Sequence, residues 1–294
     1  MRLHVAAPAS TANLGSGFDC AALALDLWNE LEVETDPDGP RVEIEGEGAG
    51  ELALDASNLV LRAFALAADP APFRFRLLNR IPLERGLGSS SAAIAAGYAA
   101  GCAVAGIPCP AGRLPLDVAA LEGHADNLAA AFNGGACLTW RDGGEVRVRR
   151  IADRAPLEAV AVIPATRGKT SAMRSRLPAP VEHAVAAVAA GRGALLGAAL
   201  ASGDPELFAQ SLGDVLHEPY RAAEAPLFAE LKQAPPDGVL GVTLSGSGPT
   251  AIAWAESADA ARVGRALSER YGEATISVLA AVATGVLARE VIST

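Results

Sequence analysis

A run of glycine and serine, Gly86-Leu87-Gly88-Ser89-Ser90-Ser91, leads directly into an alanine-rich segment over residues 92–105. Because alanine is the strongest helix former whereas glycine and serine favour turns, this boundary predicts a loop that opens a helix. The first turn of a helix leaves backbone N–H groups without partners and carries a positive partial charge, so the loop is a candidate anion site. The alternative interpretation is a flexible glycine-serine connection.

The chain has 294 residues, enough for about two domains of ~100–200 residues each. Hydrophobic residues make up 51% of it and charged residues 20%, which excludes a disordered or collagen-like chain. The formal net charge of −10 argues against a nucleic-acid binder, because such a protein needs a cationic surface. A few arginines and backbone amides can still hold a small anion locally.

The spacing of the cysteines and the length of the apolar runs indicate the cellular compartment in which the protein is expected. Cys20, Cys102, Cys109 and Cys137 form no CxxC pair, and no histidine lies at metal-ligand spacing from them, so we expect reduced thiols. No basic segment followed by an apolar run opens the chain, and the apolar segments are interrupted before ~20 residues. We expect a cytoplasmic protein with no signal peptide, membrane span or nucleic-acid partner.

Alternation of apolar and charged residues marks strands in the first half of the chain. Residues 30–35 and 42–45 alternate on either side of the turn-forming residues 36–40, which predicts an antiparallel hairpin. Asn58 is typical of a helix N-cap and predicts a helix through Ala68. Further elements expected in this half are a strand at 73–77, a helix at 116–132 and a strand at 146–148.

Residues 149–156, which contain arginine and proline, are the candidate boundary between two domains, at 1–152 and 153–294. The second block is expected to hold strands at 160–163, 239–244, 251–254 and 275–281, and helices at 181–190, 194–201, 206–216, 222–231 and 258–271. Helices and antiparallel strands in two blocks indicate an α+β protein.

Other residues could carry chemistry beside the first loop. Ser245-Gly246-Ser247-Gly248-Pro249 could present backbone amides to the same phosphate from the second domain, or form a tight turn. Two such loops suggest a ligand clamped between the domains. Glu122 could supply the hard oxygen that Mg²⁺ prefers, or be a solvated helix residue. Arg174 and Arg221 could clamp a carboxylate or phosphate, or lie on the surface.

Two better-known motifs are excluded. A Walker A loop requires a glycine at position 163, before Arg167-Gly168-Lys169-Thr170, and the residue there is Ile163. The run Gly88-Ser89-Ser90-Ser91-Ala92 approximates a hydrolase nucleophile elbow, but that site needs a downstream acid followed by a histidine. The later histidines, His124, His183 and His217, have no context that fits.

In this order the motifs resemble those of the GHMP kinase superfamily. The segment Pro8-Ala9-Ser10-Thr11-Ala12-Asn13-Leu14-Gly15-Ser16-Gly17-Phe18-Asp19 is similar to the first motif, with Ser16 where a proline is common. Pro82-Leu83-Glu84-Arg85-Gly86-Leu87-Gly88-Ser89-Ser90 resembles the phosphate loop, and Leu244-Ser245-Gly246-Ser247-Gly248-Pro249-Thr250 the third motif.

Segments between these motifs resemble the homoserine kinases within that superfamily. They are Leu121-Glu122-Gly123-His124-Ala125-Asp126-Asn127 with Gly134-Gly135, Thr170-x3-Arg174-x2-Leu177-Pro178, and Glu218-Pro219-Tyr220-Arg221. The resemblance implies ATP-dependent phosphorylation of the side-chain hydroxyl of L-homoserine to O-phospho-L-homoserine, in threonine biosynthesis. It also implies a two-domain architecture with a ribosomal-S5-domain-2-like N-terminal domain, a ferredoxin-like C-terminal domain, and a possible homodimer.

The resemblance assigns residues to three ligands. The nucleotide would contact Asn58, Pro82, Leu83, Glu84, Arg85, Gly86, Leu87, Gly88, Ser89, Ser90, Ser91 and Ala92, and Mg²⁺ would be held by Ser90 and Glu122. Homoserine would be surrounded by Asn13, Asp19, His124, Asn127, Arg174 and Arg221. Asn127 and Arg174 are the expected catalytic residues, and whether Asp126 acts as a general base is left open.

Two rival interpretations stay open from sequence alone. One is a related kinase that acts on a mevalonate-like, shikimate-like or sugar substrate. The other is a protein of this fold that binds its ligands without catalysis, against which the retained Glu122 and the intact phosphate loop both argue.

Overall fold

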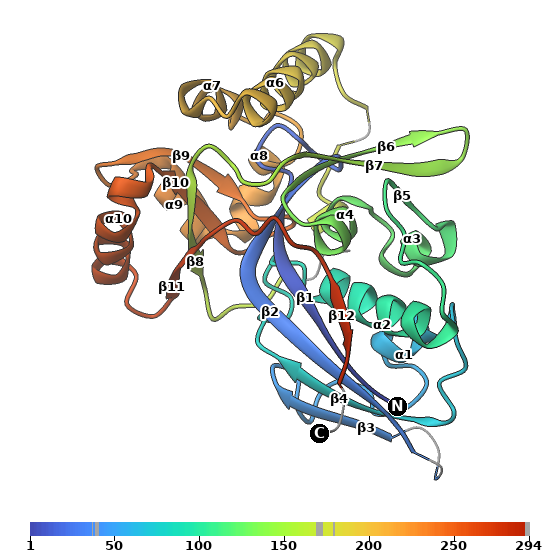
Figure 1. Cartoon of the computed structure of the whole chain (residues 1–294). Coiled ribbons are helices and arrows are strands. Elements are labelled where there is room, and N and C mark those ends of the chain that lie inside the picture. The colour runs from blue at the N-terminus through green and yellow to red at the C-terminus, as the bar shows by residue number, and fades with distance from the viewer. Residues whose placement is uncertain (37, 39–40, 169–172, 179, 292–294) are drawn as a thin grey trace.

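The computed structural model describes residues 1–36, 38, 41–168, 173–178 and 180–291 and contains an eight-stranded and a four-stranded sheet (Figure 1). The larger sheet runs in the order β12-β1-β2-β6-β7-β5, with β4 beside β2 and β3 beside β4. Its strands are β1 (Arg2–Ala12), β2 (Ala21–Thr35), β3 (Arg41–Gly46), β4 (Phe73–Asn79), β5 (Arg113–Leu114), β6 (Ala136–Asp142), β7 (Glu145–Ala152) and β12 (Leu287–Glu290).

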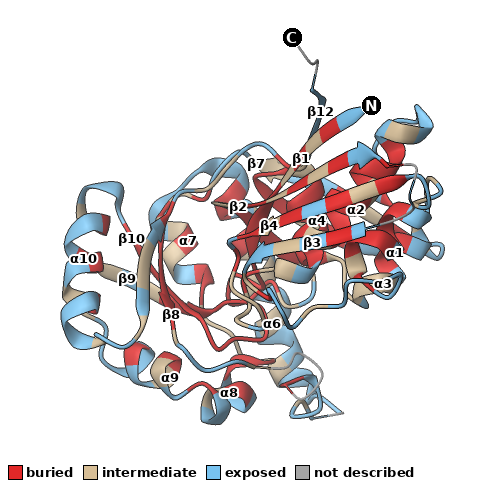
Figure 2. Cartoon of the chain, turned by 90° about the horizontal axis from the view of Figure 1, so that it is seen from below, coloured by how far each residue is buried: buried red, intermediate tan, exposed pale blue. Residues whose placement is uncertain are grey.

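Helices α1 (Leu59–Ala65), α2 (Ser89–Ala105) and α4 (Asp126–Asn133) pack against the larger sheet and bury its core (Figure 2). Helix α2 is rich in alanine and glycine because it is wedged between the sheet and α1. A Cβ at Gly97 would lie 2.3 Å from the backbone O of Val60, and one at Gly101 would lie 2.6 Å from that of Phe64. The predicted loop-to-helix boundary at residues 86–91 is confirmed, since α2 begins at Ser89.

The predicted antiparallel hairpin of residues 30–35 and 42–45 is wrong. Strand β3 pairs in parallel with β4, and β4 pairs antiparallel with β2, so β4 separates the two strands that the hairpin would have joined. The chain crosses from β3 to β4 through α1, and parallel neighbours require such a crossover. Residues 37, 39 and 40 of the expected turn lie outside the described residues.

The predicted helix at 116–132 is also wrong as a single element. It forms α3 (Leu116–Glu122) and α4, which are separated where Gly123 adopts a left-handed backbone with φ of +89°. Glycine takes this conformation without steric cost and so ends α3. The break places Glu122, His124 and Asp126 around one short turn.

The four-stranded sheet has the order β11-β8-β10-β9 and is antiparallel throughout. Both faces of β8 are buried: Val160 and Val162 belong to one core cluster, while Ala159 and Ala161 belong to the other. Helices α9 and α10 cover the first face, and the core of the larger sheet covers the second. The elements are β8 (Glu158–Ile163), β9 (Val239–Leu244), β10 (Ala251–Ala255), β11 (Thr275–Leu279), α9 (Pro226–Gln233) and α10 (Ser257–Arg270).

The predicted division at residues 152 and 153 falls between β7 and β8 and stays a prediction, and the last strand, β12, pairs with β1 of the larger sheet. Several helix predictions in this half differ from the structure. The segments 181–190 and 194–201 form one helix, 206–216 is helical only to Ser211, and 222–231 begins as a 3-10 turn. The helices are α6 (His183–Ser202), α7 (Pro205–Ser211), α8 (Glu218–Arg221) and η1 (Ala222–Glu224).

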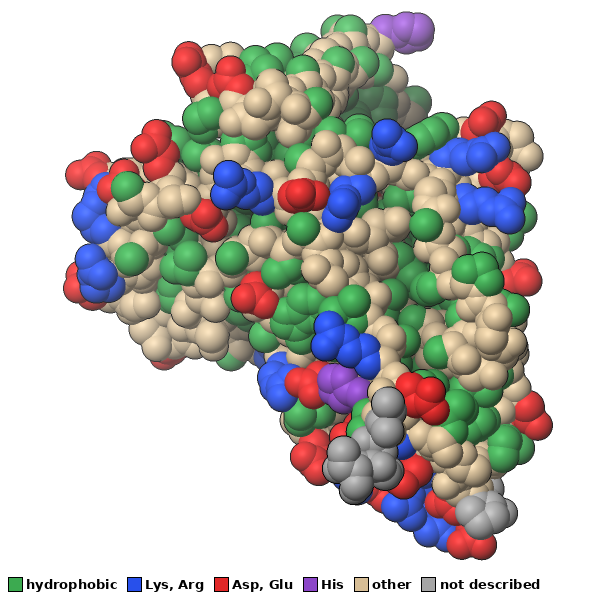
Figure 3. Space-filling view, in the orientation of Figure 1, with side chains coloured by type: hydrophobic (Ala, Val, Ile, Leu, Met, Phe, Trp, Pro, Cys, Tyr) green, Lys and Arg blue, Asp and Glu red, His purple; other side chains and the backbone are tan. Residues whose placement is uncertain are grey.

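Among the described residues, α6 is long and apolar enough to cross a membrane, which is weak evidence by itself. The sequence argument from interrupted apolar runs therefore does not hold for this helix, and the absence of a membrane span stays a prediction. On the face shown in Figure 3, acidic and basic side chains are interspersed rather than gathered into one basic patch. That distribution gives no footprint for a nucleic acid on this face.

Candidate active site

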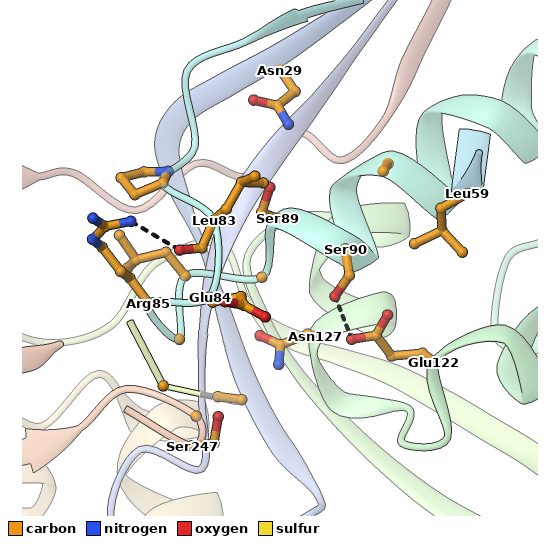
Figure 4. A pocket seen from close by; sticks show the side chains of 18 of the residues that line it. Asn29, Leu59, Leu83, Glu84, Arg85, Ser89, Ser90, Glu122, Asn127 and Ser247 are labelled. Carbon is orange, nitrogen blue, oxygen red and sulfur yellow. Dashed lines mark hydrogen bonds between the residues drawn. The ribbon is translucent and has the colours of Figure 1, made fainter. Parts of the chain in front are cut away.

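A cavity of about 740 Å³ opens where the phosphate-loop candidate meets the loops that follow β1 and β9 (Figure 4). Backbone hydrogen bonds hold the three segments together. The Ser10 amide donates to the Leu87 carbonyl at 3.1 Å, and the Gly246 amide donates to the Ala12 carbonyl at 3.1 Å. Residues more than 200 positions apart in the chain thus build one wall.

The glycines of the loop are required by close approach as well as by backbone conformation. Gly86 and Gly88 have φ of +77° and +69°. A Cβ at Gly86 would lie 2.2 Å from the Ser245 carbonyl oxygen, and one at Gly88 would lie 2.2 Å from Ser10 Oγ. The loop is therefore wedged between the two other glycine-containing segments, with the N-terminus of α2 at the cavity.

The side chains of Ser90 and Glu122 both line the cavity and point toward each other, as Figure 4 shows. Ser90 Oγ donates to Glu122 Oε1 at 2.7 Å. The Glu122 side chain is 9% exposed, and burial raises its carboxyl pKa. A hydroxyl and a carboxylate in this position form a hard-oxygen donor set of the kind that Mg²⁺ binds.

The turn after Glu122 brings further polar side chains to the cavity. His124 Nδ1 lies 3.6 Å from Asp126 Oδ1, and the neighbouring carboxylate raises the pKa of His124. Asp126 is buried, and its Oδ1 accepts a hydrogen bond from the backbone N–H of Asn127 at 2.7 Å. Asn127 Oδ1 accepts from Ser10 Oγ at 2.7 Å, which ties α4 to β1.

The loop after β1 presents Asn13 and Asp19, and both residues have a left-handed backbone. Asn13 Oδ1 accepts from the Asp19 amide at 3.0 Å, and its Nδ2 donates to the Gly246 carbonyl at 2.8 Å. Arg174 binds the Asp19 carboxylate through both terminal nitrogens, at 2.9 Å from Nη1 and 2.7 Å from Nη2. These two sequence-predicted residues therefore form an ion pair at the cavity.

Arg221 lines the same cavity but is only 2% exposed. Its Nη1 donates to the Gly246 carbonyl at 3.1 Å, and its guanidinium lies 5.5 Å above the centre of the Phe18 ring. Burial lowers the pKa of this guanidinium. No ion pair to Arg221 is present in the described part of the chain, so its charge has no carboxylate within 4.0 Å there.

Asn58 caps α1: its Oδ1 accepts from the Val60 amide at 2.9 Å, and its Nδ2 donates to the Ala53 carbonyl at 2.7 Å. The residues expected to surround homoserine all line the cavity, as do Asp126, Glu122, Asn58 and the loop from Pro82 to Ser90. Ser91 and Ala92 do not line it and are fully buried. Thr170 of the predicted arginine motif lies outside the described residues.

Sequence reasoning missed several polar residues that line the cavity, among them Asn29, Ser57 and Asn79. Asn29 lies within β2, and its Oδ1 accepts from the Arg80 and Ile81 amides at 2.8 and 2.9 Å. Asparagine is disfavoured in strands, so its presence in a long strand was a usable signal.

This combination of a glycine-rich loop at a helix N-terminus and a second loop from another sheet is that of a GHMP kinase. The family described as the GHMP kinases N terminal domain matches residues 52–135, and the family described as GHMP kinases C terminal matches residues 196–273. The expected α+β class and two-domain GHMP kinase architecture are confirmed.

Comparison with known proteins shows which GHMP kinases this chain is similar to. A homoserine kinase from Moorella thermoacetica is 41% identical over 85% of this chain and 86% of its own length, and one from Mycobacterium sp. (strain KMS) is 42% identical over 83% and 82%. A homoserine kinase structure from Cytophaga hutchinsonii superposes with a TM-score of 0.87 at 28% identity, covering 98% of this chain and 97% of that one. The chain belongs to the homoserine kinase family.

Proposed function

We propose that the protein transfers the terminal phosphoryl group of ATP to the side-chain hydroxyl of L-homoserine, giving O-phospho-L-homoserine for threonine synthesis. Family membership supports the reaction. The structural observation that carries the proposal is one cavity lined by the glycine-rich loop, the Ser90–Glu122 pair and the buried Arg221. A triphosphate, a metal and a carboxylate-bearing substrate each find a complementary group there.

We place the ATP phosphates against the first turn of α2, where helix amides lack intrahelical acceptors. The adenine would lie toward Asn58 and Leu59, which line the same cavity. Mg²⁺ fits Ser90 and Glu122 because both offer oxygen and the Glu122 carboxylate has no described cation within hydrogen-bond distance. When bound, the ion neutralises phosphate charge in phosphoryl transfer.

Homoserine is a zwitterion, so its site must satisfy a carboxylate and an ammonium group. Arg221 suits the carboxylate, because its hydrogen-bond acceptors among the described residues are a carbonyl and a ring nitrogen, both uncharged. Asp19 suits the ammonium, and Arg174 positions it through their ion pair. In this assignment Arg174 reaches the substrate carboxylate only if it leaves Asp19.

Phosphoryl transfer depends mainly on in-line positioning and on stabilisation of the transferred oxygens. Asn127 is placed to orient the homoserine hydroxyl, because Ser10 already donates to its Oδ1 and thereby fixes the amide. Asp126 lies one residue away, with one carboxylate oxygen accepting from a backbone amide. We propose that the reaction proceeds without Asp126 as an obligatory base.

A coupled ADP-release assay with homoserine, mevalonate, shikimate and galactose, each with and without Mg²⁺, tests the proposal. We expect metal-dependent ADP release with homoserine only. Turnover with one of the other alcohols would replace the substrate assignment. Binding of ATP and homoserine without ADP release would show a non-catalytic protein. A cytoplasmic location and a homodimer also stay proposals, and light scattering after size-exclusion chromatography tests the second.

A further inference from the structure

His217 is the N-cap residue of α8 and is fully buried. Its ring makes four contacts that the sequence did not indicate, one of them between Nε2 and Asp214 Oδ2 at 3.8 Å. Nε2 lies 3.1 Å from the Gly15 carbonyl oxygen, and Nδ1 lies 3.3 Å from Arg221 Nη1. The ring also stacks on Phe18, with centroids 5.0 Å apart and an angle of 22° between the planes.

The partners of His217 determine where its proton sits. A backbone carbonyl can only accept, so Nε2 must carry the hydrogen that is donated to Gly15. A guanidinium can only donate, so Nδ1 must offer a lone pair to Arg221. Burial lowers the pKa of His217 to about 4, which keeps the ring neutral and consistent with this tautomer.

The contact constrains one terminal nitrogen of Arg221. Nη1 is shared between His217 Nδ1 and the Gly246 carbonyl, and the guanidinium carbon lies over the Phe18 ring. In the described part of the chain no hydrogen bond engages Nη2 of Arg221. The protein thus fixes one terminal nitrogen and leaves the other uncommitted.

His217 does not line the cavity, so direct contact with a substrate or a proton-transfer role does not fit. The Asp214 carboxylate, which lies 3.8 Å from Nε2, holds the backbone: its Oδ2 accepts from the backbone amides of His217 and Glu218 at 2.7 and 2.8 Å. The backbone at the start of α8 is therefore anchored by Asp214, while Nδ1 of the ring contacts Arg221.

We infer that His217 is a positioning residue for substrate recognition: its Nδ1 lone pair fixes Arg221 so that the guanidinium presents its free edge to the substrate carboxylate. This inference rests on the proposed function, in which Arg221 binds that carboxylate. It predicts that His217 affects the KM for homoserine, acting through Arg221, and leaves the KM for ATP unchanged.

Two substitutions separate the two sides of the ring. In His217→Asn the amide oxygen can replace Nδ1 as an acceptor for Arg221, whereas in His217→Gln the amide nitrogen can replace Nε2 as a donor to Gly15. Only His217→Gln loses the hydrogen bond to the charged Arg221. We therefore expect His217→Gln to raise the homoserine KM by ~10-fold and His217→Asn to raise it by less than ~3-fold. The reverse order would show that the Gly15 contact matters, and would overturn the inference.

The effect must also disappear when Arg221 is absent. Arg221→Ala by itself should raise the homoserine KM with little change in the ATP KM, because it removes ground-state binding. Adding His217→Gln to Arg221→Ala should then change the homoserine KM by less than ~2-fold, since contacting residues are not additive. Full additivity would mean that His217 acts by another route and would overturn the inference. His183→Gln, the same change at an exposed position, is the control and should match the parent.

The parent protein supplies a measurement that needs no variant to fold. In ¹⁵N imidazole spectra between pH 6 and 8, we expect the His217 ring as the Nε2–H tautomer. Its Nδ1 resonance should shift on addition of homoserine and not of ATP alone. An Nδ1–H ring or an unresponsive Nδ1 overturns the inference. If the parent releases no ADP with homoserine, the proposed function itself fails and takes the inference with it; parental turnover with unchanged variants removes the inference alone.

Discussion

Ser90 Oγ donates a hydrogen bond to Glu122 Oε1 at 2.7 Å, which links the first turn of α2 to the last residue of α3. The two residues are 32 positions apart in the chain. Gly123 ends α3 directly after Glu122, so the carboxylate sits at the helix terminus beside the loop amides. The pair is therefore a preformed oxygen donor set at the position where the phosphates are proposed to lie.

Glu122→Gln should keep the hydrogen bond to Ser90 while removing the negative charge. Because one charged group that stabilises a phosphoryl-transfer transition state is lost, we expect kcat to fall by ~10²–10³-fold. The Mg²⁺ concentration needed for half-maximal activity should also rise. A titration of ADP release against Mg²⁺ measures both.

The matched control is Asp117→Asn, the corresponding change of a carboxylate to an amide at an exposed position of α3. It should leave kcat and the Mg²⁺ dependence at the parental values. Parental metal dependence in Glu122→Gln would contradict the assignment of Glu122 as a metal ligand.

Gly88→Ala tests whether close approach, beyond backbone conformation, requires glycine in the loop. The two ends of α2 offer a comparison, because Gly88 and Gly106 have φ of +69° and +67°. A Cβ at Gly106 meets no atom within 4 Å, whereas one at Gly88 would meet Ser10 Oγ at 2.2 Å and Asn127 Oδ1 at 3.2 Å.

Gly106→Ala should therefore lower the free energy of unfolding by ~1–2 kcal/mol through backbone strain alone, with activity retained. Gly88→Ala should lose a further ~1–3 kcal/mol from overpacking and should raise the ATP KM. Urea unfolding together with ATP titrations measures the two effects. Equal stability losses with unchanged ATP KM would show that the loop tolerates a side chain.

Asp126→Asn tests the role of the buried carboxylate beside Asn127. The amide oxygen of the variant can still accept from the Asn127 backbone, so the start of α4 should keep its structure. We expect kcat to stay within ~10²-fold of the parent, because a dedicated base contributes ~10²–10⁴-fold. A larger loss in a variant whose thermal unfolding is unchanged would identify Asp126 as the base.

His217 should make stability depend on pH below neutrality. Burial lowers the pKa of its ring in the folded protein to about 4; the charges of Arg221 and Lys232 act in the same direction and that of Asp214 acts against it. Since the unfolded ring has a pKa near ~6.5, the unfolded state gains a proton first as pH falls. The contribution of a neutral ring is complete above ~6.5 and is lost toward pH 4.

Between pH 7 and pH 5, the difference in free energy of unfolding between the parent and His217→Asn should shrink by roughly 2 kcal/mol, at ~1.4 kcal/mol per pH unit below ~6.5. Urea unfolding at both pH values measures it. His183→Gln removes an exposed histidine and should show a constant difference from the parent. A constant difference for His217→Asn would mean that its ring titrates alike in both states.

The sequence predicted correctly those helices and strands whose own residues show the pattern typical of the element. Strand β4 and helix α2 occur where alternation and alanine content placed them, and Asn58 caps α1. The hairpin failed because alternation gives no information about which strands are neighbours, and β4 inserts beside β2. The predicted helix at 116–132 failed because one left-handed glycine, Gly123, overrode the helical pattern on both sides.

In the candidate site too, residues that form a consecutive motif were predictable, whereas residues whose partners lie far away in the chain were not. The loop at residues 86–91 was recognisable because its glycines and serines are consecutive. Asn29 was missed because its role depends on the backbone amides of residues 80 and 81, which arrive from another strand. His217 had no fitting context in the sequence for a similar reason, since its partner Gly15 lies 202 positions away.

The sequence by itself determined the class of chemistry, because a phosphate loop needs contiguous residues with particular backbone freedom. Only the tertiary structure decided which charges are paired. It joins Arg174 to Asp19 and leaves Arg221 buried among neutral acceptors within the described chain. That choice depends on distances between segments far apart in the chain, because charge interactions and desolvation act through space, and residue order does not encode them.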